Sequence, residues 1–300
     1  MNSSNTSLII QGPVRPNTLK CLQNIIRYAN NFSAIIFSTF HEESGLFYAV
    51  KSYCENNNVI FLAINPPSIK YTYNYSNIYY QVISTLSACE KLDTEFVIKM
   101  RSDETYSNLN KLYDLADEQK INFSNIFFRS LKCVRKFPVA KNILVQQFNE
   151  IYDKKYSCYH YHSSDHIICC KSNILQNAYD LCKNICRNIH EIYKFVANID
   201  NTIFNDSYDL LGNRTYNQYS LCPEQLLSLC FLKVIKPDIS IDFKNKIQNT
   251  ELFRKYFHII NIDNLAPYIV SAQNQIVGHI KYSPCYLPSD INTILEYNYE

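Results

Sequence analysis

The fold of this chain is decided by the stretch Phe96-Val97-Ile98-Lys99-Met100-Arg101-Ser102-Asp103-Glu104. A short apolar run ends there in a cation, a hydroxyl and two adjacent carboxylates, which is the pattern of a strand that stops in a polar loop. In an open α/β sheet, ligands bind in the crevice outside the carboxyl ends of the strands. Carboxylates at such an end can hold a hard divalent cation or accept hydrogen bonds from a sugar.

Strands and helices are predicted to alternate through the first half of the sequence. Short apolar runs that end in turn residues predict strands, and longer segments with apolar residues at helical spacing predict helices. The predicted strands cover residues 7–11, 34–39, 59–64 and the run from 96, and the predicted helices cover 17–31, 42–53 and 76–91. This order, with continuous apolar strands, predicts a mostly parallel, Rossmann-like α/β sheet flanked by helices on both faces.

The connections between parallel strands place polar residues from distant parts of the sequence together. Right-handed crossovers put the loops that follow the strands at one edge of the sheet. Gly12, Ser38, Thr39 and Asp103 are therefore expected to line one cleft. Gly12 would let a ligand approach the backbone closely.

The second half of the sequence is less regular. Strands are predicted at 125–130 and 166–171, helices at 141–152 and 172–193, and a polar loop at about 195–220. Pro223 and Glu224 open another helix, since Pro suits the first helical position and an acid suits the first turn. The expected result is a mixed and more irregular second half, with no marked domain boundary.

Composition restricts the class of protein. The net charge of +2 over 300 residues argues against a nucleic-acid partner, because such proteins concentrate positive charge. The 12 cysteines include no C-x-x-C pair, and many lie in apolar runs, where free Cys behaves as a small hydrophobe. No N-terminal signal peptide and no apolar run near the ~20 residues of a membrane span is expected, so the predicted location is the cytoplasm.

Six short motifs along the chain are informative through their order and spacing. They are Ile10-Gln11-Gly12-Pro13-Val14, Ile36-Phe37-Ser38-Thr39, Gln81-Val82-Ile83-Ser84-Thr85, Lys99-Met100-Arg101-Ser102-Asp103, Ser164-Asp165-His166 and Pro223-Glu224-Gln225. In order and spacing they resemble the WavE lipopolysaccharide synthesis family, which belongs with the GT-A fold nucleotide-sugar glycosyltransferases.

The resemblance implies one GT-A-like glycosyltransferase domain over residues 1–300. Residues 1 to about 130 would bind the nucleotide-sugar donor, and residues from about 131 to 300 would form the acceptor half and C-terminal elements. The implied reaction moves a sugar to a glycan or glycolipid acceptor in the synthesis of lipopolysaccharide or another surface polysaccharide. Peripheral membrane association would be compatible with that acceptor.

The resemblance also implies roles for individual residues. The residues that it implies for donor binding are Gln11, Gly12, Pro13, Ser38, Thr39, Gln81, Arg101 and Asp103. The residue that it implies for catalysis is Asp165, with Glu224 as the reserve base. Asp103 would hold a divalent metal, Mn²⁺ or Mg²⁺. The chain departs from the D-x-D triplet of many GT-A enzymes, since no second acid lies two residues from Asp103. Arg101 and Lys99 are then expected to neutralise part of the diphosphate charge.

Plainer roles remain open for several of these residues. Thr39 and Glu42 have the spacing of a capping box, Asp165 has the setting of a turn residue, and Glu224 that of a first-turn acid. Two other functions are also open. One is a metal-dependent hydrolase that uses His160, His162, Asp165 and His166, although their spacing is one residue longer than the usual H-x-H-x-D-H run. The other is a non-catalytic nucleotide-sugar-binding relative.

Overall fold

The computed structural model describes residues 5–27, 32–68, 73–106, 109, 126–128, 131–135, 156–163, 167–187, 191–192, 194–195, 223–240, 252, 255–259 and 267–270. For 73–77, 126–128, 131–135, 156–163, 223–225, 258–259 and 267–270 the description covers the backbone alone. The predicted helix at 141–152 and most of the predicted loop at 195–220 lie outside these residues.

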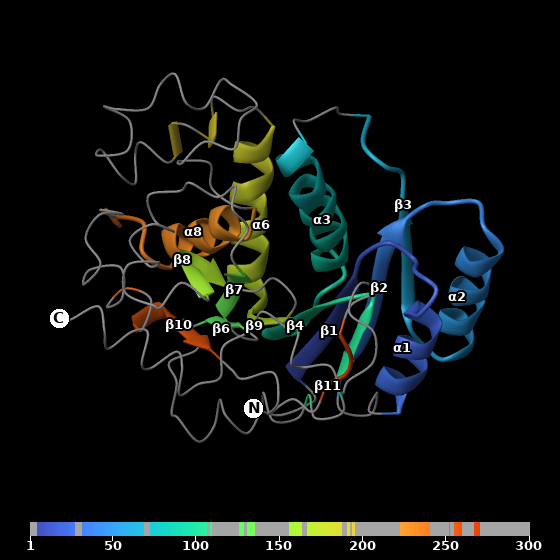
Figure 1. Ribbon diagram of the computed structural model, residues 1–300. Helices are drawn as coiled ribbons and strands as arrows, with labels where there is room; N and C mark the ends of the chain where they lie inside the picture. The colour runs from blue at the N-terminus through green and yellow to red at the C-terminus, as the bar shows by residue number, and fades with distance from the viewer. Residues whose placement is uncertain are drawn as a thin grey trace.

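One seven-stranded sheet organises the described part of the chain (Figure 1). Its strands, from one edge to the other, are β3 (Ile60–Ile64), β2 (Ala34–Phe40), β1 (Thr6–Gln11), β4 (Phe96–Arg101), β9 (Ile167–Lys171), β6 (Ile126–Phe128) and β10 (Phe257–Ile259). The first four pair in parallel, β10 pairs in parallel with β6, and β9 runs antiparallel to both of its neighbours. The predicted mostly parallel sheet with a mixed second half is confirmed.

Two small antiparallel pairs accompany the main sheet. The first joins β5 (Glu104–Tyr106) to β11 (Pro267–Val270), and the second joins β7 (Leu131–Arg135) to β8 (Tyr156–Ser163). Because β5 follows β4 after a two-residue turn, the first pair holds the chain immediately beyond the carboxyl end of β4.

Helices cover both faces of the sheet, as predicted (Figure 1). One face carries α1 (Thr18–Ile26) and α2 (Gly45–Asn56), and the other carries α3 (Tyr73–Cys89), α6 (Ser172–Cys186) and α8 (Pro223–Ile235). Successive strand residues point to opposite faces. Leu8 and Ile10 accordingly pack in the core with α1 and α2, while Ile9 packs in the core with α3, α6 and α8.

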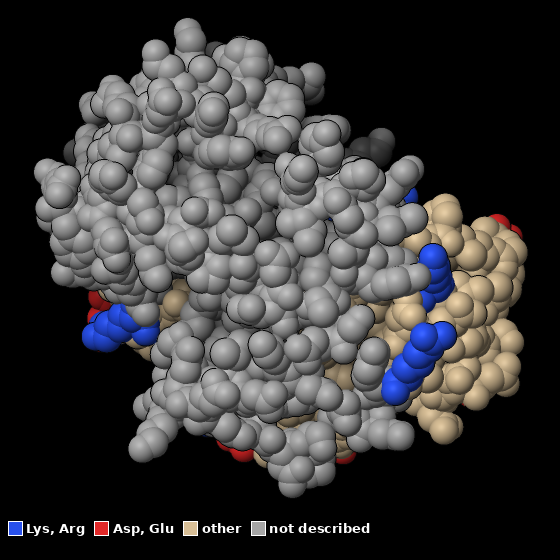
Figure 2. All heavy atoms as spheres, turned by 60° about the horizontal axis from the view of Figure 1, so that its bottom comes forward, with Lys and Arg blue, Asp and Glu red and all other residues tan. Residues whose placement is uncertain are grey.

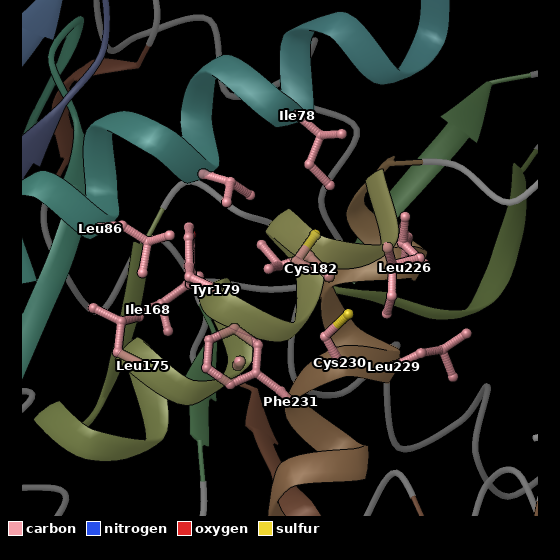
Figure 3. Packing of buried hydrophobic residues seen from close by; sticks show 14 of the residues in the cluster. Ile78, Leu86, Ile168, Leu175, Tyr179, Cys182, Leu226, Leu229, Cys230 and Phe231 are labelled. Carbon is pink, nitrogen blue, oxygen red and sulfur yellow. The ribbon is translucent and has the colours of Figure 1, made fainter. Parts of the chain in front are cut away.

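The core between the sheet and α3, α6 and α8 combines aromatic, aliphatic and thiol side chains (Figure 3). Tyr179 and Phe231 meet edge to face, with ring centroids 6.0 Å apart, an arrangement that aromatic pairs favour. Cys182 and Cys230 are buried beside them and carry free thiols, like all eight cysteines whose side chains are described. Burial raises the pKa of the Cys54 and Cys89 thiols to about 12. These cysteines behave as the small hydrophobes that the sequence predicts.

The described surface residues carry charges of both signs. Acidic and basic side chains both occur among the described residues on the face drawn in Figure 2, as the totals of 29 Lys and Arg against 27 Asp and Glu lead one to expect. Among the helices that the structure describes, none combines the length and apolar character that crossing a membrane requires.

The start of α2 differs from the prediction. The helix begins at Gly45, and its N-cap is Ser44, whose Oγ accepts a hydrogen bond from the Phe47 N–H at 3.1 Å. Thr39 is still within β2, so the predicted capping box of Thr39 and Glu42 is wrong. Thr39 precedes the actual N-cap, Ser44, by five residues, so it does not lie at the start of the helix.

Replacing the Ser44 cap gives a direct test of this helix start. Ser44→Ala should lower the free energy of unfolding by about 1 kcal/mol, because one backbone N–H of the first turn loses its acceptor. Ser52→Ala is the matched control, since Ser52 lies on the exposed side of the same helix and Ala is the better helix former. Urea denaturation should show a loss for Ser44→Ala and no loss for Ser52→Ala; equal effects would contradict the assignment of the cap.

Candidate functional site

Hydrogen bonds join the ends of three neighbouring strands. The Gly12 N–H donates to the Ser38 carbonyl at 3.2 Å, and the Ser102 N–H donates to the Gln11 carbonyl at 2.9 Å. These bonds continue the pairing of Gln11 with Ser38 on one side and with Arg101 on the other. The loops after β1, β2 and β4 therefore meet at one edge of the sheet, where α/β proteins bind ligands.

Gly12 is required by its neighbour Ser102. Its φ of 142° lies in a region that L side chains rarely adopt, and a Cβ added there would lie 2.5 Å from Ser102 Oγ. Ser102 Oγ in turn donates to the Pro13 carbonyl at 2.8 Å. The sequence predicted that Gly12 leaves space for a ligand, but the space beside its Cα is filled by Ser102. The glycine thus serves the close contact between two loops.

Substitution of Gly12 should therefore cost stability. Gly12→Ala places a Cβ against the Ser102 hydroxyl and requires an L residue to adopt an unfavourable φ. The strained backbone alone is expected to cost about 1–3 kcal/mol. Gly45→Ala is the matched control, because a Cβ at Gly45 would meet nothing within 4 Å. Chemical denaturation should show a large loss for the first variant and none for the second. A Gly12→Ala protein as stable as the parent would contradict this account.

The end of β2 is attached to α3. Ser38 Oγ donates to the Ser84 carbonyl at 2.7 Å, and Ser84 Oγ bonds back to the carbonyls of Tyr80 and Gln81. Ser38 is fully buried, so it positions the turn of α3 that carries Gln81. Thr39 is also buried, and within the described part of the chain its Oγ1 has no hydrogen-bond partner. The role of Ser84 was not predicted, since a serine in the middle of a helix has no distinctive pattern.

The Arg101 guanidinium and the Asp103 carboxylate form a two-pronged ion pair. Arg101 Nε donates to Asp103 Oδ1 at 3.0 Å, and an Arg101 terminal nitrogen donates to Oδ2 at 3.3 Å. The Arg101 side chain is 37% exposed, whereas that of Asp103 is 8% exposed. The pair therefore presents its cationic member toward solvent and keeps its anionic member behind.

The turn that carries Asp103 is fixed from α1. Asn17, the residue at the N-cap of α1, donates its side-chain amide to the Asp103 carbonyl at 3.1 Å and makes no capping bond of its own. The sequence predicted that a helix begins at residue 17 but did not predict this contact. Burial raises the pKa of the Cys21 thiol to about 12, and the negative charges of Asp103 and Glu104 are the next largest causes of this rise. Cys21 therefore stays a neutral packing residue of α1 behind the turn.

The surroundings of Asp103 do not suit a hard divalent cation. Mg²⁺ and related ions need several oxygen ligands around one point, but both Asp103 oxygens bond to Arg101. The adjacent Glu104 is fully buried and accepts a hydrogen bond from the Tyr106 hydroxyl. Nowhere in the described part of the chain do three or more His, Cys, Asp or Glu side chains gather as a metal site would need. The predicted metal role of Asp103 gains no support from its neighbours.

Lys99 lies deeper in the same strand. Strand alternation places it on the same face as Arg101, and its neighbours across the sheet are Ile9 and Ile168. Its side chain is fully buried. Of the two cations in this motif, Arg101 is the one that reaches the edge of the sheet.

The structure describes no side chain of the predicted catalytic residues. Asp165 and His166 lie outside the described residues, and His160 and His162 belong to β8, of which the backbone alone is described. Glu224 is the second residue of α8, also with the backbone alone. The strand after Asp165 is described, however: β9 begins at Ile167, opposite Met100 near the carboxyl end of β4. The roles of these residues stay predictions.

Comparison with known proteins finds likeness in structure alone. No protein family and no curated protein matches the sequence. Mouse xyloside xylosyltransferase 1 in its apo form is 8% identical, with a TM-score of 0.43, over 91% of this chain and 99% of that chain. A mannosyltransferase from Pyrobaculum calidifontis, solved with GDP-Man and Mn²⁺, is 11% identical, with a TM-score of 0.36, over 57% of this chain and 46% of that one.

A nucleotidyltransferase is similar to the same degree. The 2-C-methyl-D-erythritol 4-phosphate cytidylyltransferase of Francisella tularensis is 10% identical, with a TM-score of 0.34, over 60% of this chain and 78% of that chain. TM-scores of this size are too low to transfer an activity, a substrate or a metal to this chain. A function must therefore be sought in its own residues.

Proposed function

We propose that this protein is a glycosyltransferase that moves a sugar from a nucleoside-diphosphate sugar to a glycan acceptor. The observation that carries the proposal is that hydrogen bonds join the ends of β1, β2 and β4. The partly exposed Arg101 guanidinium lies at the end of β4. We expect a nucleoside to lie against the exposed turn at Pro13 and a diphosphate to meet the Arg101 guanidinium. Both belong to the chemistry of a nucleotide-sugar donor.

Each part of the donor has a group to receive it. A leaving diphosphate develops negative charge, and a fixed cation at that place stabilises the transition state. Arg101 supplies that cation, with a planar fork suited to phosphate oxygens. The nucleoside would lie over the loop of Gln11, Gly12 and Pro13, of which Pro13 is exposed. The buried Ser38 and Thr39 would support this loop from the end of β2, with Gln81 close by on α3. A donor held at both ends has its anomeric carbon positioned for attack.

The acceptor hydroxyl must lose a proton if the reaction inverts the anomeric configuration. We assign this step to Asp165, with Glu224 in reserve, since a positioned carboxylate is a suitable general base. Support for Asp165 comes from the strand that follows it. It precedes β9 by two residues, and β9 starts beside the end of β4 that carries Arg101.

The finer parts of the proposal rest on the order of the motifs. A member of a WavE-like family would act in lipopolysaccharide or other surface polysaccharide synthesis, on a glycan or glycolipid acceptor, from the cytoplasmic side and with peripheral membrane association. No step is assigned to Mn²⁺ or Mg²⁺, because the side chains described around Asp103 do not form a fitting set of ligands.

Nucleotide binding is the first test. The protein should be stabilised by one of the nucleoside diphosphates UDP, GDP, CDP, ADP and TDP in a thermal-shift screen, because a ligand that binds only the folded state adds about 2.7 kcal/mol at a hundredfold excess over its Kd. The same concentration of inorganic pyrophosphate is the control for non-specific anion binding. If no nucleoside diphosphate shifts the transition more than pyrophosphate, with or without Mn²⁺, the proposed function is wrong.

The assignment of the base is tested by turnover. With a sugar donor that carries the nucleotide identified by the screen, Asp165→Asn should bind the nucleotide nearly as the parent does and should turn over roughly 10²–10⁴ times more slowly, the usual loss for a general base. Release of the nucleoside diphosphate from the sugar donor measures the rate. Glu224→Gln is the matched comparison and should retain most activity. A fully active Asp165→Asn protein would move the base elsewhere or indicate a retaining reaction.

A further inference from the structure

The end of β4 differs from an acidic metal-binding triplet because it has a cation where the triplet has an acid. Two residues before Asp103, where such a triplet would have its other acid, the chain has Arg101. Two residues after Asp103 it has Thr105, a buried hydroxyl residue. The remaining neighbour acid, Glu104, is fully buried and bonded to the Tyr106 hydroxyl. A divalent ion on the Asp103 oxygens would face a guanidinium that those oxygens already bind.

Asp103 is held in the orientation that serves Arg101. The two parallel hydrogen bonds of 3.0 and 3.3 Å match a carboxylate to a guanidinium fork, which is the strong form of such a pair. The backbone around Asp103 is fixed by the Asn17 amide and by the Ser102 bonds to Gln11 and Pro13. The carboxylate therefore cannot turn toward another ligand without breaking the pair.

Exposure decides which member of the pair meets a ligand. The Arg101 side chain is 37% exposed and that of Asp103 only 8% exposed. A guanidinium fixed from behind by a carboxylate has lost much of its rotational freedom before a ligand arrives, so less entropy is lost on binding. Its planar fork suits two phosphate oxygens at once.

We infer that Arg101, positioned by Asp103, supplies the positive charge that binds the donor diphosphate, and that donor binding therefore needs no divalent metal. This inference rests on the proposed function, since it concerns the diphosphate of the same donor. It assigns Asp103 to positioning Arg101 and not to holding Mn²⁺ or Mg²⁺. Arg101 is the residue that touches the ligand.

The test measures Kd by isothermal titration with UDP, GDP, CDP, ADP and TDP on metal-stripped full-length protein. Each nucleotide is titrated in EDTA and again in Mn²⁺. The expected result is that the nucleotide that binds does so with the same Kd within about threefold in both buffers. Binding that needs Mn²⁺ would overturn the inference and leave the proposed function standing. Failure of every nucleotide in both buffers would overturn the proposed function and the inference with it.

Variants test the two roles separately in EDTA. Arg101→Ala should weaken diphosphate binding roughly 10- to 100-fold, as expected for the loss of charge-assisted hydrogen bonds. Arg101→Lys should lose less, because it keeps the charge but not the fork. Affinity for the nucleoside without phosphates should not change in either variant, which a general disruption of the loops would not allow. An Arg101→Ala protein with unchanged diphosphate affinity would overturn the inference.

The chain offers a closely matched control cation. Lys171 is also 37% exposed and pairs with a carboxylate, that of Glu95, at 3.3 Å. It ends β9 opposite Phe96, at the other end of β4 from Arg101. Lys171→Ala should leave the Kd within twofold of the parent. A loss as large as that of Arg101→Ala would mean that overall charge, and not the position of Arg101, governs binding.

Asp103→Asn separates positioning from metal binding. It should weaken diphosphate binding by about the same factor in EDTA and in Mn²⁺, and less than Arg101→Ala does, because the amide oxygen can still accept one guanidinium hydrogen bond. The circular dichroism spectrum and the urea midpoint check that the variant is folded. If the parent binds more tightly in Mn²⁺ and Asp103→Asn abolishes that gain alone, Asp103 is a metal ligand and the inference is wrong.

Discussion

The register of β1 between β2 and β4 is the constraint on which the rest of the site depends. Gln11 pairs with Ser38 on one side and with Arg101 on the other, so three loops from distant parts of the sequence start at the same level. A shift of one residue in either pairing would turn every side chain of the shifted strand to the opposite face. Apolar residues on both faces of these strands are buried. The packing of two cores therefore fixes the position of the polar edge.

Because side chains alternate between the two faces of the sheet, the polar edge is held differently on each face. Ser38 lies on the face of α3 and uses its hydroxyl to hold the turn of Gln81. From the other face, α1 reaches the turn after β4 through the Asn17 amide. Gly12 lies between these connections, and its lack of a side chain lets Ser102 approach. The loops are thus held by the sheet, by both helical layers and by each other.

The sequence predicted the parts of this arrangement that repeat and missed those that depend on a single contact. Apolar runs identified β1, β2, β3, β4, β6 and β9, since strands of a mostly parallel sheet are rich in apolar residues. The start of α2 was misplaced because Thr39 and Ser44 are both good caps in isolation, and only the extent of β2 decides between them. The close contact of Gly12 with Ser102 was not predicted because the two residues are ninety positions apart in the chain. Asp165 and the side chain of Glu224 lie beyond the described residues, so their roles rest on sequence alone.

The motif Arg101-Ser102-Asp103 shows how a neighbouring cation can change what an acidic residue does. A lone carboxylate at a strand end can bind a cation from solution, but a carboxylate beside a fixed guanidinium already has one. The interaction then keeps that guanidinium oriented, because separating the pair would leave the mostly buried Asp103 carboxylate without the Arg101 charge. Ser102 lies between the two and is tied to the β1 loop through Pro13, so the pair and the glycine loop keep one relative position. A cation built into the sheet in this way is in place before any ligand binds, and this is the condition under which fixed charge stabilises a developing anion most effectively.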